Sequence, residues 1–141
     1  MLRANIYFTV VIIVIVMSVV LVSGCSSPVV QRYGSVIGID KENIDEYVKL
    51  HQDTWPGVLE MIEKCHIQNY SIYLGQLEKD KYYLFSYFEY TGDDFEKDMA
   101  RMARDKTTQE WWTHTDPLQR PIPTRKPGEH WAAMKEVFHH K

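Results

Sequence analysis

Two long runs of strand-forming residues, separated by four polar residues, constrain the fold of this chain more than any other feature. Residues 69–77 and 82–90 are rich in tyrosine, phenylalanine, leucine and isoleucine, and the link between them reads Glu-Lys-Asp-Lys. A short polar link between two such runs is typical of a β-hairpin. In the first run, alternation of side chains places Tyr70, Ile72 and Leu74 on one face. We therefore expect Tyr70 to point toward whatever that face covers.

The order of the remaining elements predicts a fold class. Residues 33–39 and 132–139 predict a first and a last strand, residues 41–54 and 57–64 a helical crossover broken at Pro56, and residues 95–104 and 109–115 further helical segments. This order is that of the α+β ferredoxin-like fold (β-α-β-β-α-β), in which helices cover one face of an antiparallel sheet. Because the other face of such a sheet is left open, we expect a homodimer.

The N-terminal residues have the composition of a secretion signal. A head that carries Arg3 precedes the almost wholly aliphatic residues 6–22, and small residues lead to Cys25. Small residues before a cysteine resemble the bacterial lipobox. We therefore expect residues 1–24 to be a lipoprotein signal peptide, residues 25–31 to be the lipidated Cys25 with its tether, and residues 32–141 to form one domain.

An uncleaved membrane anchor is the alternative for this segment, because about 17 to 20 apolar residues can span a bilayer. Both interpretations predict a membrane-anchored protein of the bacterial cell envelope, on the periplasmic or outer-membrane side.

Composition excludes several partners and kinds of chemistry. The net charge of -3 gives no basis for nucleic-acid binding. Beyond Cys25 the chain has only Cys65, so no internal disulfide is expected. The adjacent His139 and His140 would point to opposite sides of a strand, so they do not predict a metal site.

Aromatic side chains and one histidine form the candidate site. Tyr47, His51 and Trp55 recur every four residues, so on one helix they lie along one stripe and can converge on a cavity. Trp111 and Trp112 diverge by about 100° on a helix, so we expect one of them to face a cavity. Indole rings stack on the apolar faces of sugars, while phenol and imidazole groups suit sugar hydroxyls. A flat aromatic ligand fits the same side chains.

Five blocks of this chain are similar, in the same order, to the L-rhamnose mutarotase family. They are Tyr47-x-x-x-His51-x-x-x-Trp55-Pro56, residues 69–74, residues 84–89, Trp111-Trp112 and residues 123–139. The resemblance covers residues 32–139 and implies a ferredoxin-like domain of the dimeric α/β-barrel type. It also implies an isomerase that interconverts the α and β anomers of L-rhamnose or a related 6-deoxy sugar.

The same resemblance implies roles for single residues. His51 falls on the family's proton donor, Tyr47 and Tyr70 fall on its sugar-binding tyrosines, and Trp111 and Trp112 fall on its tandem tryptophans. The chain departs from the family pattern at Gln52, at Gly57 and at His130, where close relatives often have an aromatic residue. These departures flank the site and leave the preferred sugar open.

Anomer exchange through ring opening needs a group that gives and takes a proton near neutral pH. Imidazole, with an unperturbed pKa of about 6.5, does this, so His51 is the expected acid/base. No metal, nucleotide or redox cofactor is expected, and the partner for the second proton is not identified by the sequence. Two alternatives stay open: a domain that binds sugar without catalysis, and a haem or monooxygenase-type domain with His51 as axial ligand.

Overall fold

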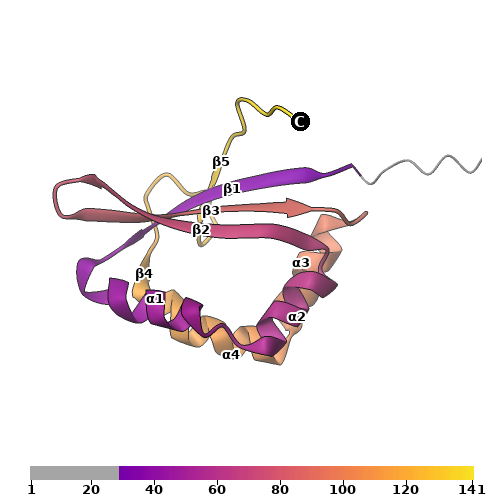
Figure 1. Cartoon of the computed structure of the whole chain (residues 1–141), viewed down its shortest axis with the longest axis horizontal. Helices are drawn as coiled ribbons and strands as arrows, with labels where there is room; N and C mark the ends of the chain where they lie inside the picture. Colours follow the sequence, from indigo (N-terminus) through magenta and orange to yellow (C-terminus); the bar gives the residue numbers. More distant parts are fainter. Residues whose placement is uncertain (1–28) are drawn as a thin grey trace, which may run out of the picture.

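A computed structural model describes residues 29–141, which form an antiparallel sheet with the four α-helices on one face (Figure 1). In chain order the elements are β1 (Gln31–Ile39), η1 (Lys41–Asn43), α1 (Ile44–Gln52), α2 (Pro56–Lys64), β2 (Ile67–Glu78), β3 (Lys81–Tyr90), α3 (Phe95–Arg104), α4 (Lys106–Thr115), η2 (Asp116–Leu118), β4 (Gln119–Arg120) and β5 (Ala132–Met134). The sheet order is β2-β3-β1-β4, and β5 also pairs with β1. The predicted ferredoxin-like fold is thereby confirmed.

The predicted hairpin forms one half of this sheet. β2 and β3 pair antiparallel from Ile67 opposite Tyr90 to Glu78 opposite Lys81. The turn between them uses a left-handed residue, Asp80 at a φ of 58°, a conformation that aspartate tolerates better than most residues. β1 then pairs with β3 over its whole length, so the three long strands form a continuous platform for the helices.

A glycine in β1 lets the chain after α4 join the sheet. β4 places Arg120 opposite Gly38 and Gln119 opposite Ile39. A Cβ atom at Gly38 would lie 2.8 Å from the backbone oxygen of Arg120, which is closer than Cβ atoms come to such atoms. The missing side chain therefore permits this pairing, and the pairing holds Gln119 close to α1.

The last strand is shorter than predicted. Only Ala132–Met134 pairs with β1, so the expected strand over residues 132–139 is wrong at its C-terminal end. Beyond β5 the chain is held by a side chain and not by the ladder, because Arg32 Nε donates to Glu136 Oε2 at 2.7 Å. Val137 and Phe138 follow with 89% and 80% of their surface exposed.

The helix α4 begins earlier than predicted. It starts at Lys106, whereas the sequence predicted that this helical segment begins at residue 109. The reason is a cap: the Asp105 carboxylate accepts from the backbone N–H of Thr108 at 2.8 Å and from its hydroxyl at 2.9 Å. Such a cap satisfies an N–H group that has no partner within the helix.

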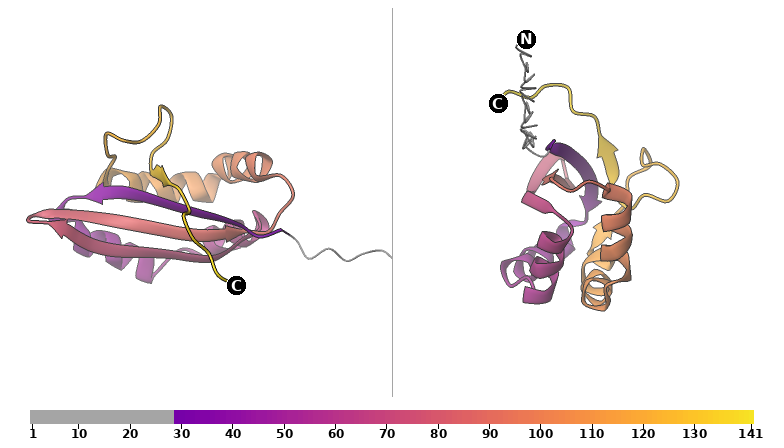
Figure 2. Two further views of the ribbon diagram at one scale, coloured as in Figure 1. Left: turned by 90° about the horizontal axis from the view of Figure 1, so that it is seen from above. Right: turned by 90° about the vertical axis from the view of Figure 1, so that its right-hand side faces the viewer.

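The buried apolar residues form two small cores. The first contains Ile37, Ile39, Tyr47 and Leu84, and the second contains Cys65, Ile67 and Tyr90. Figure 2 shows α1 with α2 and α3 with α4 as two pairs beneath the sheet. A cavity of about 850 Å³ is lined by residues of both cores, so the fold encloses space between the sheet and the helices.

The predicted signal peptide (residues 1–24) and Cys25 lie outside the described residues. Within residues 29–141, no helix has the length and apolar character needed to cross a bilayer.

Candidate active site

All five residues to which the resemblance gave a role in the site line this one cavity. Tyr47 and His51 come from α1, Tyr70 comes from β2, and Trp111 and Trp112 come from α4. Most of the other lining side chains are apolar: Val48, Val58, Leu59, Ile62, Ile67, Ile72, Leu74, Leu84, Phe88, Met99, Met102 and Trp131. The cavity is therefore an apolar pocket with a few polar groups, which is typical of small-molecule sites.

The surroundings of His51 fix which ring nitrogen can act on a ligand. Its Nδ1 lies 2.9 Å from the backbone oxygen of Tyr47. A carbonyl oxygen only accepts, so Nδ1 carries the hydrogen and Nε2 holds the free lone pair in the neutral ring. Burial lowers the pKa of His51 below 6.5, and the bond to the Tyr47 carbonyl offsets this only in part. The neutral ring, with a basic Nε2, is therefore favoured near neutral pH.

Tyr47 is almost completely buried in the cavity wall. Only 3% of its surface is exposed, and its hydroxyl accepts a hydrogen bond from Gln119 Nε2 at 3.3 Å. Burial, and to a smaller extent the nearby Tyr70, raises the pKa of Tyr47 above 10, while the bond from Gln119 opposes this. The hydroxyl therefore keeps its proton.

The two tryptophans both line the cavity, whereas the sequence predicted this of one. Trp111 is 5% exposed and makes edge contacts with both His51 and Trp55, each with ring centroids 5.4 Å apart. Trp112 is half-buried. Trp111 is thus part of the core as well as of the cavity wall. Trp112 lines the cavity but is less buried, so it contributes less to the packing of the core.

Trp55 does not take the place that the four-residue spacing predicted. α1 ends at Gln52, so the stripe of Tyr47 and His51 stops one turn early, and Trp55 does not line the cavity. It stands immediately before α2, whose first residue is Pro56, and also contacts His114 with ring centroids 5.4 Å apart. Trp55 and Pro56 therefore form a structural corner.

Tyr70 lines the cavity and is also partly open to solvent. Its side chain lies on β2 with 45% of the residue exposed, and its ring meets Phe88 edge-on at 5.6 Å. Its position between solvent and the interior suits a residue that meets an entering ligand.

The structure adds polar residues that sequence reasoning missed. Asp116 and His130 also line the cavity, and Gln119 joins them to Tyr47, because His130 Nε2 lies 2.9 Å from Gln119 Oε1. All three follow α4, in or beside the link over residues 117–128, which contains four prolines. The only signal in the sequence was His130 itself, which departs from the family pattern but was assigned no role.

Metal ligands do not gather in the described part of the chain. Within residues 29–141, no group of three or more histidine, cysteine, aspartate or glutamate side chains is arranged to hold a metal ion. What the cavity does offer is a basic imidazole nitrogen, two phenolic hydroxyls and two indole faces. Together these groups can bind a small polyol and move a proton on it.

The sequence model of the L-rhamnose mutarotase family matches residues 32–140. Relatives include the L-rhamnose mutarotases of Oceanobacillus iheyensis, 31% identical over 77% of this chain and 97% of that protein, and of Shouchella clausii, 30% identical over 77% and 96%. The L-rhamnose mutarotase of Bacillus subtilis is 29% identical over 77% of this chain and 97% of its own length.

A solved structure shares the fold. The crystal structure of an L-rhamnose mutarotase from Formosa agariphila superposes with a TM-score of 0.58 at 18% identity, covering 79% of this chain and 99% of that one.

The comparisons contradict the location predicted from the sequence, a lipoprotein held at the bacterial cell envelope through Cys25. The matches to the O. iheyensis and S. clausii proteins take up 97% and 96% of those proteins. These relatives therefore leave no room for an apolar leader like residues 1–24. The envelope location predicted from the sequence is corrected on the basis of these relatives.

The family model spans most of the chain, and the first of these relatives is 31% identical along nearly its whole length. The chain therefore belongs to the L-rhamnose mutarotase family.

Proposed function

We propose that residues 32–141 act as an aldose mutarotase that interconverts the α and β anomers of L-rhamnose or a related 6-deoxy sugar. The observation that carries this proposal is the state of His51, whose Nδ1 is bound to the Tyr47 carbonyl at 2.9 Å. Its Nε2 is therefore free to exchange a proton in an aromatic-walled cavity. The relatives described above carry the same activity in their names.

The chemistry follows from this geometry. Nε2 of His51 removes the proton from the anomeric hydroxyl, so that C1 forms a double bond to O1 while the bond from C1 to the ring oxygen breaks. The resulting imidazolium returns the same proton to the ring oxygen, which gives the open-chain aldehyde. Rotation about C1–C2 and the reverse steps close the ring as the other anomer. General acid-base help of this kind accelerates a reaction by about 10² to 10⁴-fold.

The other residues of the cavity bind the sugar. Tyr47 and Tyr70 offer hydroxyl groups from opposite layers of the fold, α1 and β2. Trp111 and Trp112 offer indole faces, which attract the C–H face and the methyl group of a deoxy sugar. A 6-deoxy sugar suits this apolar wall better than a sugar with a hydroxyl at C6, because a buried hydroxyl needs a hydrogen-bond partner.

A homodimer is a second part of the proposal. The sheet face opposite the helices and the C-terminal tail expose large apolar groups, including Tyr73 at 63%, Leu77 at 65% and Phe138 at 80%. Apolar groups gathered on one face favour a partner, and an identical copy supplies the same groups in return. Sedimentation of the full chain tests this: we expect a dimer that Phe138→Asp weakens, and a monomeric parent protein would contradict it.

Saturation-transfer NMR on L-rhamnose tests the activity directly. Irradiating the H1 signal of one anomer should reduce the H1 signal of the other only when the protein is present. L-Fucose, L-mannose and D-glucose report on sugar preference, and L-mannose is the matched control because it adds only the C6 hydroxyl to L-rhamnose. Binding detected by tryptophan fluorescence without exchange would overturn the proposal in favour of a sugar-binding domain, and a Soret band on titration with haem would favour the haem alternative.

A further inference from the structure

Three side chains form a hydrogen-bonded chain that ends at the hydroxyl of Tyr47. His130 Nε2 lies 2.9 Å from Gln119 Oε1, and Gln119 Nε2 lies 3.3 Å from the Tyr47 hydroxyl oxygen. The three come from separate parts of the fold: α1, β4 and the segment before β5. Two direct side-chain contacts therefore connect His130 to Tyr47 through Gln119.

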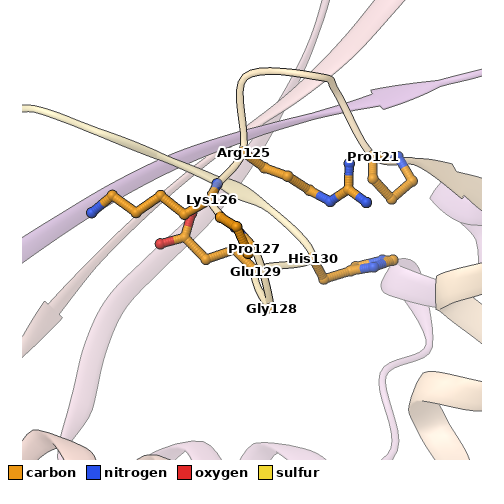
Figure 3. Close-up of a pocket in the computed structure, with 7 residues that line it drawn as sticks. All are labelled: Pro121, Arg125, Lys126, Pro127, Gly128, Glu129 and His130. Atoms are coloured by element: carbon orange, nitrogen blue, oxygen red, sulfur yellow. Dashed lines mark hydrogen bonds between the residues drawn. The ribbon is translucent and has the colours of Figure 1, made fainter.

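His130 also connects these hydrogen-bonded side chains to the loop that begins at Pro121. It lines the main cavity together with Tyr47, and it lines a second hollow of about 450 Å³ formed by the loop from Pro121. Figure 3 shows the His130 ring extending away from Lys126 and Glu129 of that loop. The imidazole therefore belongs to the cavity wall.

The hydrogen bonds from His130 through Gln119 to Tyr47 all run in one direction, because the surroundings of His130 decide which of its ring nitrogens carries the hydrogen. Its Nε2 faces two acceptors, Gln119 Oε1 at 2.9 Å and Asp116 Oδ1 at 3.8 Å. Two acceptors at one nitrogen favour a hydrogen on that nitrogen. Nε2–H then donates to the Gln119 oxygen, and the amide of Gln119 must turn its N–H toward Tyr47.

We propose that Gln119 and His130 commit the Tyr47 hydroxyl to donate a hydrogen bond into the cavity, to the ring oxygen of the sugar. The identity of that oxygen rests on the proposed function. The Tyr47 oxygen already accepts from Gln119, so its own hydrogen is left for a ligand. Negative charge develops on the ring oxygen as its bond to C1 breaks, and a fixed donor stabilises such charge. Gln119 and His130 are then positioning residues that act through Tyr47.

The direction of the chain can be tested without any sugar. Long-range ¹H–¹⁵N correlation spectra distinguish a histidine protonated at Nε2 from one protonated at Nδ1. At a pH where both rings are neutral we expect His130 to carry its hydrogen on Nε2 and His51 to carry it on Nδ1. A hydrogen on Nδ1 of His130 would overturn the inference, whatever the activity of the protein.

A substitution that reverses the hydrogen bond between residue 119 and Tyr47 tests whether the Tyr47 hydroxyl acts as a donor to the sugar. Gln119→Glu still accepts from His130 but can no longer donate to Tyr47, so the Tyr47 hydroxyl must turn toward the new carboxylate and away from the sugar. We expect Gln119→Glu to slow anomer exchange by about 10²-fold, the typical cost of one lost donor. Tyr47→Phe should cost as much, and the double variant should cost no more than either.

Matched variants separate this effect from charge and from folding. Gln76→Glu makes the same change on an exposed part of β2 and should leave exchange at the parent rate. His130→Phe should slow exchange, and His130→Gln, which keeps an N–H near the position of Nε2, should restore most of the loss. Thermal unfolding at the parent midpoint confirms that each variant is folded.

The outcomes separate the two proposals. If the parent protein exchanges anomers and Gln119→Glu does so equally fast, or if the losses in Gln119→Glu and Tyr47→Phe multiply in the double variant, this inference fails and the proposed function stands. If the parent protein shows no exchange with any sugar, the proposed function fails, and the donor to a ring oxygen fails with it. The tautomer of His130 then still decides in which direction the hydrogen bonds from His130 to Tyr47 run.

Discussion

The phenol of Tyr47 and the imidazole of His51 stack with their ring centroids 4.1 Å apart and an angle of 29° between their planes. The backbone oxygen of the same tyrosine holds Nδ1 of the histidine at 2.9 Å. One residue therefore fixes both the orientation and the tautomer of the other. This arrangement depends on a spacing of four residues on α1, which places the two side chains one above the other.

The pH dependence of exchange should report the neutral form of His51. Because burial disfavours the imidazolium, the pKa of His51 lies below 6.5, and the basic form persists at a lower pH than for an exposed histidine. We therefore expect kcat/KM for exchange to fall on the acid side with a midpoint below 6.5 and to stay level above it. The spontaneous rate at each pH is subtracted. A midpoint above 6.5 would contradict a buried base at this position.

The two adjacent tryptophans should respond differently to truncation. Trp111 is 5% exposed and packs against His51 and Trp55, so Trp111→Ala should lower the free energy of unfolding by about 3 to 5 kcal/mol. Trp112 is half-buried, so Trp112→Ala should retain most of the stability and should mainly raise KM. Urea unfolding and exchange kinetics on both variants check this. Equal losses of stability would show that Trp112 is also a core residue.

A methyl group on Gly38 should disturb the site from a distance. Its Cβ would meet the backbone oxygen of Arg120 at 2.8 Å, and backbone cannot move aside as a flexible side chain can. We expect Gly38→Ala to cost about 1 to 3 kcal/mol of stability and to slow exchange, because β4 also carries Gln119. Urea unfolding measures the first effect and NMR exchange the second.

Gly34→Ala is the control in the same strand. Its Cβ would meet the terminal methyl of Met134 at 3.3 Å, and that methyl can move. Gly34→Ala should therefore be tolerated, and an equal effect of both substitutions would contradict the explanation based on β4.

The sequence predicted those parts of the fold that depend on local pattern. Alternating apolar residues and short polar links predicted the three long strands, and Pro56 predicted the break between α1 and α2. The ends of elements were less predictable because they depend on distant partners. Gly38 leaves the space that β4 needs to pair with β1. β5 ends at Met134, and beyond it Glu136 is bound by the side chain of Arg32.

The candidate site divides in the same way. Tyr47, His51, Tyr70, Trp111 and Trp112 could be chosen from spacing and from resemblance, and all line one cavity. Gln119 and His130 could not be, because they lie in or beside an irregular link with no periodicity. Only the tertiary fold brings them to Tyr47. Trp55 shares the regular spacing, but Trp55-Pro56 is better interpreted as a structural corner, and in the structure α1 ends at Gln52 and Trp55 stands immediately before α2.

The central claim, that His51 moves the proton, is tested most directly by the rate of anomer exchange in His51→Ala. The matched control is His114→Ala, which removes a half-exposed histidine that does not line the cavity. With both variants folded, saturation-transfer NMR on L-rhamnose should show a loss of about 10² to 10⁴-fold for His51→Ala and no loss for His114→Ala. Exchange at the parent rate in His51→Ala would contradict the account.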